Sequence, residues 1–154
     1  MANVNSWELE ITSSIPASKV FQGFVVGFFD FLDYYVLPAS LGAKFTNLQG
    51  DGGVGTIKLM SYEDGFFPSV KYKIKTVDLE NFTYSMAVVD DDENESTLSE
   101  MKVIPSVDGG CTFIQKTTEY KGIDEDEVES QKEQAAQWFK TFERTVTDQD
   151  AKDE

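Results

Sequence analysis

One stretch of the chain decides its fold class: DGGCTFIQKTTEYKGIDEDEVESQKEQAAQWFKTFERTV, residues 108–146. Its first part, Cys111 to Tyr120, alternates between two faces, which is typical of a β-strand. After Gly122 the apolar residues recur at helical spacing instead. That stripe consists of Ala135, Trp138, Phe139, Phe142 and Val146. The pattern predicts a last strand followed by a long helix from about Asp126 to Asp148.

The N-terminal part begins with a second clear alternation. Trp7, Leu9 and Ile11 alternate with polar residues, which predicts a half-buried first strand. Apolar residues at helical spacing then predict two short helices, 17–26 and 30–36, with Pro38 ending the second. Their aromatic density is too high for exposed helices, so they must cover an apolar surface.

The middle of the chain reads as strands separated by turn signals. The candidate strands are Thr56–Tyr62, Val70–Val77, Phe82–Val89, Ser96–Ile104 and Cys111–Tyr120. Their short spacing predicts an antiparallel meander, because parallel strands need longer crossovers. The whole chain, residues 1–154, is therefore predicted to be one α+β ligand-binding domain, with residues 149–154 as a frayed acidic tail.

The composition excludes several classes of partner. Lys and Arg number 13 against 28 Asp and Glu, a formal net charge of -15, which disfavours nucleic acid and anionic membranes. Histidine is absent and Cys111 is the single cysteine, so we expect no metal and no cofactor. The polar N-terminus shows no secretory signal, and a lone cysteine suits a reducing compartment, so we expect a cytoplasmic protein.

Two motifs resemble known ion or nucleotide sites. Gly50, Gly52 and Gly55 spell G-x-G-x-x-G, with Gly53 between them. A dinucleotide site requires a helix after this motif, but a strand pattern follows it here, so a glycine-rich hairpin loop is favoured. Lys58 could attract an anion weakly. Residues 90–95 begin like a calcium loop but lack its glycine and its final glutamate, which favours a solvated hairpin turn.

Polar residues on the inward faces predict a cavity. Tyr72, Tyr84 and Met86 lie on inward faces of neighbouring strands, and Gln115 and Glu119 share a face with Phe113. A close-packed core would use Leu, Ile and Val instead, so a partly wet cavity for an amphipathic ligand is favoured over a solid core. Trp138 should face this cavity, whereas Trp7 should lie further from its mouth.

Several stretches of the sequence resemble one known family in matching order. They are Ile15–Ala17, Gly50–Lys58, Ser61–Phe66, Asn81–Tyr84, Asp108–Gly110 and Gln131–Glu133. Together they resemble the plant pathogenesis-related class 10 family, which includes the major birch-pollen allergen. The resemblance implies the helix-grip fold: a seven-stranded curved antiparallel sheet, two short helices and a long C-terminal helix that enclose a cavity. It also implies a cytosolic, defence-related or stress-related protein that carries, stores or senses a plant metabolite of the flavonoid, hormone or alkaloid type.

The resulting ligand-binding residues come from all parts of the chain. They are Phe28, Tyr72, Tyr84, Met86, Phe113, Gln115, Ala135, Trp138 and Phe139, with Phe67 and Pro68 at the entrance.

Two enzymatic alternatives stay open. The family also contains norcoclaurine synthases, and here Glu119, Tyr84 or Tyr72 would act as the acid or base; Gln115 occupies the position of the synthase's lysine. Some members are credited with ribonuclease activity. This weaker alternative would use Glu143, but Thr145 replaces the tyrosine that the resemblance expects.

Overall fold

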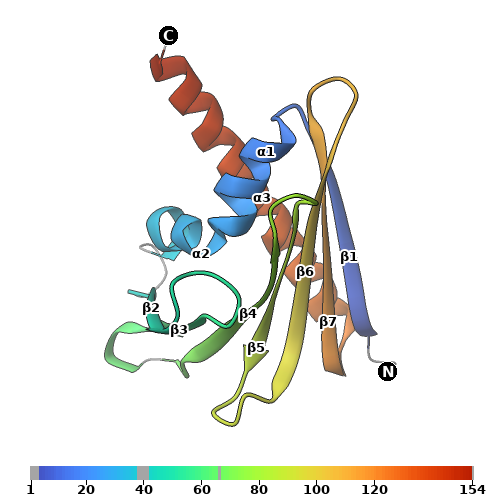
Figure 1. Ribbon diagram of the computed structural model, residues 1–154. Coiled ribbons are helices and arrows are strands. Elements are labelled where there is room, and N and C mark those ends of the chain that lie inside the picture. Colours follow the sequence, from blue (N-terminus) through green and yellow to red (C-terminus); the bar gives the residue numbers. More distant parts are fainter. Residues whose placement is uncertain (1–3, 38–41, 66, 154) are drawn as a thin grey trace.

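A computed structural model describes residues 4–37, 42–65 and 67–153 of the chain. The architecture is α+β: a curved antiparallel sheet, short helices at one end, and a long C-terminal helix along the concave face (Figure 1). The strands are β1 Val4–Ser13, β2 Lys44–Gln49, β3 Ile57–Ser61, β4 Val70–Asp78, β5 Thr83–Val89, β6 Glu95–Pro105 and β7 Cys111–Ile123. They form one sheet in the order β1-β7-β6-β5-β4-β3-β2, so the predicted fold class is confirmed.

The strand register fixes an inner and an outer face. Trp7 pairs with Thr117, which pairs with Ser99, then Met86 and Ile74, and this row faces the helices. Because successive residues of a strand point to opposite faces, the neighbouring row lies on the outside. It consists of Glu8, Lys116, Glu100, Ser85 and Thr76. Simple alternation therefore sorts the side chains of β1, β7 and β6 along these rows, whereas on β4 a register shift between Ile74 and Thr76 puts two residues of equal parity on opposite faces.

The short helices cover one end of the concave face. The first is α1, Ala17–Val20, continued by wider π-type turns over Phe21–Val26; the second is α2, Phe28–Phe31, continued in the same way over Leu32–Val36. The break falls at Gly27, with φ -86° and ψ 17°, inside the gap predicted between the two helices; the second helix begins at Phe28 and not at residue 30. Glycine explains this position, because it most easily leaves helical geometry. Pro38 lies outside the described residues.

The long helix α3 spans Glu125–Asp153. Asp124 lies just before it and accepts a hydrogen bond from the Glu127 N–H at 2.8 Å, which caps the helix start. The helix continues to Asp153, past the predicted end near Asp148. Fraying of the last residues stays a prediction.

An aromatic cluster joins the three layers. Phe24, which is 2% exposed, lies 5.2–5.7 Å from the ring centroids of four neighbours with strongly inclined or edge-on geometry. These neighbours are Phe28, Phe31, Phe113 and Phe139, from α2, β7 and α3. Such pairs stabilise a fold beyond their buried area, so this cluster holds the helices against the sheet.

One strand escaped the sequence prediction. β2, Lys44–Gln49, is exposed at every position except half-buried Phe45, so it shows no apolar alternation. The glycine-rich segment that follows is a loop between β2 and β3, as predicted. Gly50 requires its residue type, because its φ is +89° and a Cβ there would lie 2.7 Å from the Cα of Thr56.

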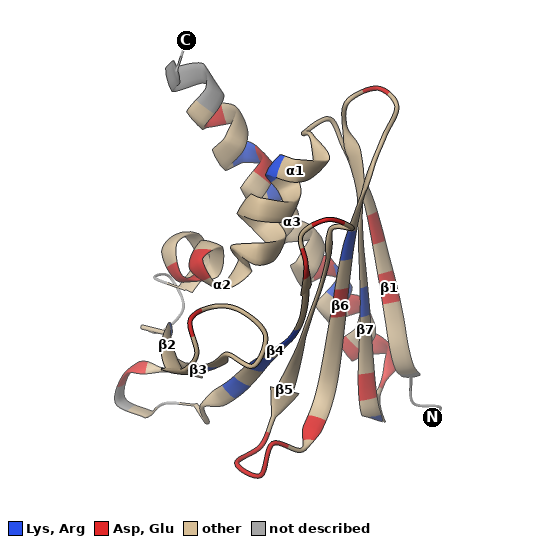
Figure 2. Ribbon diagram, viewed as in Figure 1, with Lys and Arg blue, Asp and Glu red and all other residues tan. Residues whose placement is uncertain are grey.

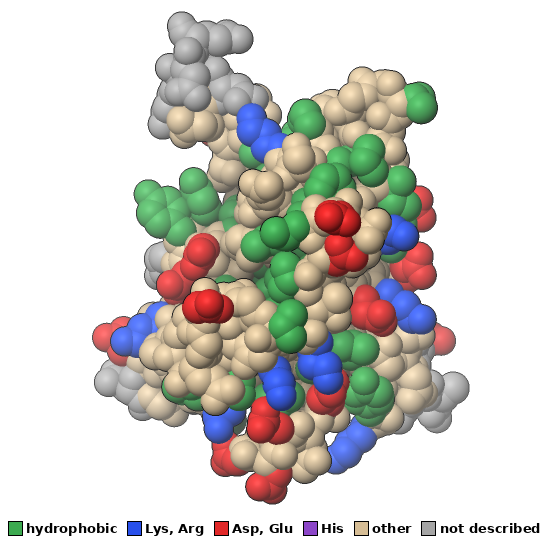
Figure 3. Space-filling model, viewed as in Figure 1, with side chains coloured by type: hydrophobic (Ala, Val, Ile, Leu, Met, Phe, Trp, Pro, Cys, Tyr) green, Lys and Arg blue, Asp and Glu red, His purple; other side chains and the backbone are tan. Residues whose placement is uncertain are grey.

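Charged side chains of both signs alternate on the outer surface. Lys71, Lys73 and Lys75 of β4 pair with acidic residues of the β5–β6 hairpin at 2.6–2.8 Å (Figure 2). Basic and acidic side chains stand side by side across the lower part of the face seen in Figure 3. Within the described residues, no helix is both long and apolar enough to cross a membrane.

Candidate ligand-binding site

A cavity of about 600 Å³ lies between the concave face of the sheet, α2 with its continuation, and α3. It is lined by Trp7, Phe28, Phe29, Leu32, Val36, Leu37, Phe45, Met60, Tyr62, Tyr72, Met86, Ala87, Val88, Thr97, Ser99, Gln115, Thr117, Glu119, Gln131, Gln134, Ala135 and Trp138. The volume is in the range of pockets that take small organic molecules.

One side of the cavity is aromatic. Tyr72 of β4 lies edge-on to Phe29, at 5.5 Å between ring centroids, and to Phe45, at 5.9 Å. On α3, Trp138 lies 5.7 Å from the ring of Phe28 at an interplanar angle of 62°. The rings brace one another in edge-to-face contacts, so this wall offers a firm apolar surface.

The other side consists of two groups of hydrogen-bonded polar side chains. On β6 and β7, the Thr97 hydroxyl donates to Glu119 Oε2 at 2.8 Å. The hydroxyls of Ser99 and Thr117 lie 3.2 Å apart, and the Gln115 amide donates to Thr117 at 3.3 Å. These polar side chains stand on inward faces of strands, where an apolar core would leave their hydrogen-bonding groups unmatched. The wall therefore presents polar groups to the cavity.

Gln131 of α3 links this polar wall to the helix. Its carbonyl oxygen accepts the indole N–H of Trp7 at 3.0 Å, and its amide nitrogen lies 3.5 Å from Glu119 Oε1 and 3.3 Å from Glu127 Oε1. The Trp7 bond fixes which end of the amide faces the two carboxylates. Helix and sheet thus meet through polar contacts at this end of the cavity.

Trp138 carries an unmatched donor. Its indole N–H is fully covered and has no hydrogen-bond partner among the described residues. Most buried polar groups in proteins are hydrogen-bonded, so this donor on a cavity wall stands out. Leaving it unmatched costs about 1–3 kcal/mol.

Comparison with known proteins agrees with this architecture. The model of the family described as Pathogenesis-related protein Bet v 1 matches residues 2–152. The chain belongs to the Bet v 1 family. A "Probable intracellular pathogenesis-related protein T1" from Catharanthus roseus is 35% identical over 151 residues, covering 93% of this chain and 95% of the relative.

Solved structures show the same fold. The crystal structure of Ara h 8.0201 has a TM-score of 0.70 and 28% identity, and the match covers 93% of this chain and 97% of that one. Norcoclaurine synthase from Thalictrum flavum, solved with dopamine and hydroxybenzaldehyde, has a TM-score of 0.55 at 23% identity and covers 75% of this chain and 69% of its own. The second likeness extends to the fold alone.

Six of the residues predicted to bind ligand line the cavity of this Bet v 1 family member. They are Phe28, Tyr72, Met86, Gln115, Ala135 and Trp138. Glu119, predicted as a possible catalytic group, lines it as well. Whether these side chains contact a ligand stays a prediction.

The structure places the other predicted residues elsewhere. Phe113 and Phe139 lie in the aromatic cluster, 5.2 Å apart, because helices α1 and α2 cover their end of the sheet. Phe67 is half-exposed and lies edge-on to Tyr62, at 5.1 Å between ring centroids. Tyr62 lines the cavity, so Phe67 lies beside the wall and not in it. Pro68 is exposed.

Two tyrosines, Tyr72 and Tyr84, differ in their access to the cavity. Burial raises the pKa of Tyr72, with a smaller contribution from Tyr62, and Tyr72 lines the cavity. Burial also raises the pKa of Tyr84 strongly, helped by the charge of Asp30, but Tyr84 packs in the core. Both phenols therefore stay protonated near neutral pH, and Tyr72 is the one that can donate a hydrogen bond into the cavity.

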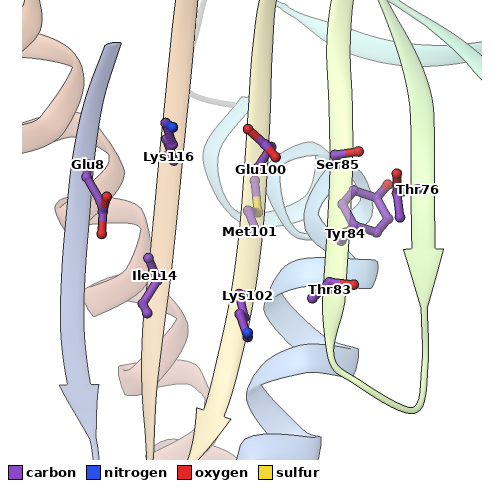
Figure 4. Close-up of a pocket in the computed structure, with 10 residues that line it drawn as sticks. All are labelled: Glu8, Thr76, Thr83, Tyr84, Ser85, Glu100, Met101, Lys102, Ile114 and Lys116. Carbon is purple, nitrogen blue, oxygen red and sulfur yellow. The ribbon is translucent and has the colours of Figure 1, made fainter.

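A second, smaller depression lies on the outside of the sheet. Its volume is about 370 Å³, and Glu8, Lys116, Glu100 and Ser85 mark it on the successive strands β1, β7, β6 and β5 (Figure 4). Tyr84 contributes to its wall from β5. None of the helices that the structure describes covers this face (Figure 1), so the depression encloses little apolar surface and is a poorer site for an amphipathic molecule.

The remaining motifs have structural roles. The Gly52 N–H donates to the buried Thr56 hydroxyl at 2.9 Å, so part of the donor capacity of the glycine-rich loop is used internally. Lys58 Nζ lies 5.4 Å from the ring centroid of Phe29. Of the ribonuclease candidates, Glu143 accepts the Ser13 hydroxyl at 2.8 Å, and Thr145 donates to the Phe142 carbonyl at 2.7 Å.

Sequence reasoning missed several wall residues. Trp7, expected further from the cavity mouth, lines the cavity directly. Thr97, Ser99 and Gln131 were not singled out, although the parity of β6 places both hydroxyl residues on the inner face. That parity was readable from the alternation of Met101 and Val103. The inward position of Gln131 was readable as well, because it lies three residues after Val128 and four before Ala135, on an extension of the stripe of α3.

Proposed function

We propose that this Bet v 1 family protein binds a small amphipathic or hydrophobic plant metabolite in the cavity, as a carrier, store or sensor. The observation that carries the proposal is the two-sided wall, with aromatic rings on one side and hydrogen-bonded polar side chains on the other. Pockets that bind small molecules combine apolar surface with a few placed polar groups in this way.

The affinity that such a cavity supports is moderate. A ligand that buries about 400 Å² of apolar surface gains roughly 10 kcal/mol at ~25 cal/mol per Å². Association costs of about 4–15 kcal/mol remove much of that gain. We therefore expect dissociation constants in the micromolar range and little discrimination among ligands with different apolar frameworks.

A matched pair of variants on one strand tests the proposal. Ser99 lines the cavity, and its neighbour Glu100 lies on the outer face, where it lines the smaller depression. Ser99→Phe should fill part of the cavity and weaken binding of a naphthalene probe at least about tenfold in calorimetry, equivalent to about 1.4 kcal/mol. Glu100→Phe should leave binding unchanged. Equal affinity in both variants, with both folded by circular dichroism, would contradict a ligand site in this cavity.

A catalytic role is the second candidate, favoured by the presence of Glu119 on the cavity wall. Glu119 would act as the base and Tyr72 as a hydrogen-bond donor. Tyr84 lies in the core and does not line the cavity, so it does not suit either role. Mass spectrometry separates the two functions, because a carrier returns its ligand unchanged. A new product that disappears in Glu119→Gln would establish catalysis.

We propose a cytoplasmic location for the protein. A relative that is 35% identical is named a probable intracellular pathogenesis-related protein, and a single cysteine, Cys111, suits a reducing compartment. Expression of the chain as a fluorescent fusion in plant cells would test this localisation.

A further inference from the structure

The cavity wall carries negative charge and no positive charge among the described residues. Among the lining residues that the structure describes, Glu119 is the only charged side chain. Lys58 lies on the same face of the sheet but sits over the Phe29 ring and does not line the cavity. Lys121, two residues beyond Glu119 in β7, is exposed. The interior is thus acidic without a basic counterpart on its wall.

The Glu119 carboxylate has unused acceptor positions for a further hydrogen-bond donor. Thr97 donates to Oε2 and Gln131 approaches Oε1, one contact on each oxygen. A carboxylate offers about four acceptor positions, so about two remain for a group in the cavity. Gln131 is itself held by the Trp7 indole, so the carboxylate is oriented by a network that extends to the helix.

The surroundings of Glu119 are negatively charged as well. Glu127 shares the Gln131 amide with Glu119, which brings a second carboxylate to the same corner. The whole chain carries a net charge of -15, a field that concentrates cations and repels anions. An anionic ligand would meet like charge and no compensating cation on the described wall, whereas a protonated amine would supply donors where acceptors stand free.

We propose that the cavity selects amphipathic amines, with the ammonium group against Glu119 and the apolar body against Phe28, Tyr72 and Trp138. This inference rests on the proposed ligand-binding function and specifies its ligand class. It also gives the polar wall a purpose, because a charge-assisted hydrogen bond is stronger than a neutral one. Neutral and anionic molecules with the same body should bind more weakly.

Three probes with one ring system separate the contributions. 2-Naphthylmethylamine is cationic near neutral pH, 2-naphthylmethanol is neutral and 2-naphthoic acid is anionic. Calorimetry with the full chain should show the amine binding at least about tenfold more tightly than the alcohol, which corresponds to about 1.4 kcal/mol, and the acid binding most weakly. Raising the salt concentration should reduce the preference for the amine.

Two variants locate the preference. In Glu119→Gln the ratio of amine to alcohol affinity should fall below about threefold, since the amide oxygen still accepts a hydrogen bond from the ammonium group but the attraction between opposite charges is lost. In Glu127→Gln, which removes the exposed carboxylate of the same corner, the ratio should stay at its wild-type value within about twofold, because an exposed charge is screened by solvent.

The outcomes separate this inference from the proposed function. Equal binding of amine and alcohol to the wild-type chain would overturn the amine preference and leave the binding function in place; this comparison needs no variant to fold. A preference that survives in Glu119→Gln would also overturn it, because the charge would then lie elsewhere. Failure of all three probes to bind would overturn the proposed function and the inference with it.

Discussion

The two tryptophans provide a matched test of the hydrogen bonding described for the cavity. Both line the cavity, but the Trp7 indole donates to Gln131 at 3.0 Å, whereas the Trp138 indole has no partner among the described residues. Replacing either by Phe keeps an aromatic ring and removes the N–H. The two substitutions should therefore differ mainly in what happens to that hydrogen bond.

The expected magnitudes follow from this difference. For Trp138→Phe, lost packing costs up to about 1.5 kcal/mol, but removing a covered donor without a partner relieves about 1–3 kcal/mol. The free energy of unfolding should change by less than about 1 kcal/mol. For Trp7→Phe the packing loss adds to the loss of the Gln131 bond, so this variant should be at least about 1 kcal/mol less stable than Trp138→Phe.

Urea unfolding followed by far-UV circular dichroism measures both values without relying on tryptophan fluorescence. A lower midpoint with an unchanged slope reports lost stability, and a changed slope would indicate altered compactness instead. The reasoning is refuted if Trp138→Phe is destabilised as much as Trp7→Phe. In that case the Trp138 donor would have to be satisfied in solution.

Three further predictions concern the cavity, the hairpin and the core. Because both tryptophans line the cavity, a naphthalene probe should quench fluorescence saturably in Trp7→Phe and in Trp138→Phe; quenching in only one would place the ligand at one end. A hydrogen bond from Lys73 lowers the pKa of Glu93, so this contact stabilises the hairpin above the unfolded pKa of about 4.3 and is lost as pH falls through the lower folded pKa. Lys73→Gln should therefore show a smaller acid-induced drop in the urea midpoint than wild type, and an identical drop would refute the pairing. Phe24→Ala should lower the free energy of unfolding by about 3–5 kcal/mol, measured by urea unfolding; a loss below about 1.5 kcal/mol would show that the aromatic cluster is not the centre of the core.

The sequence determined the architecture because its periods are local. Alternation in β1 and β7 and the stripe of α3 depend on residues a few positions apart, so they can be read without knowing what packs on them. β2 shows the limit of this reading, because an edge strand that is exposed almost throughout carries no period. The absence of histidine likewise settled in advance that no histidine ligates a metal or acts as a base.

Only the tertiary structure decided which residues line the cavity. Phe113 and Gln115 share one face of β7, yet Phe113 lies in the aromatic cluster and Gln115 lines the cavity. Trp138 and Phe139 are neighbours on α3, yet Trp138 lines the cavity and Phe139 lies in the aromatic cluster. A period of two or 3.6 fixes which face of an element turns inward. It does not fix which part of that face another element covers, because the covering side chains, Phe24 above all, come from a helix nearly ninety residues away in the chain.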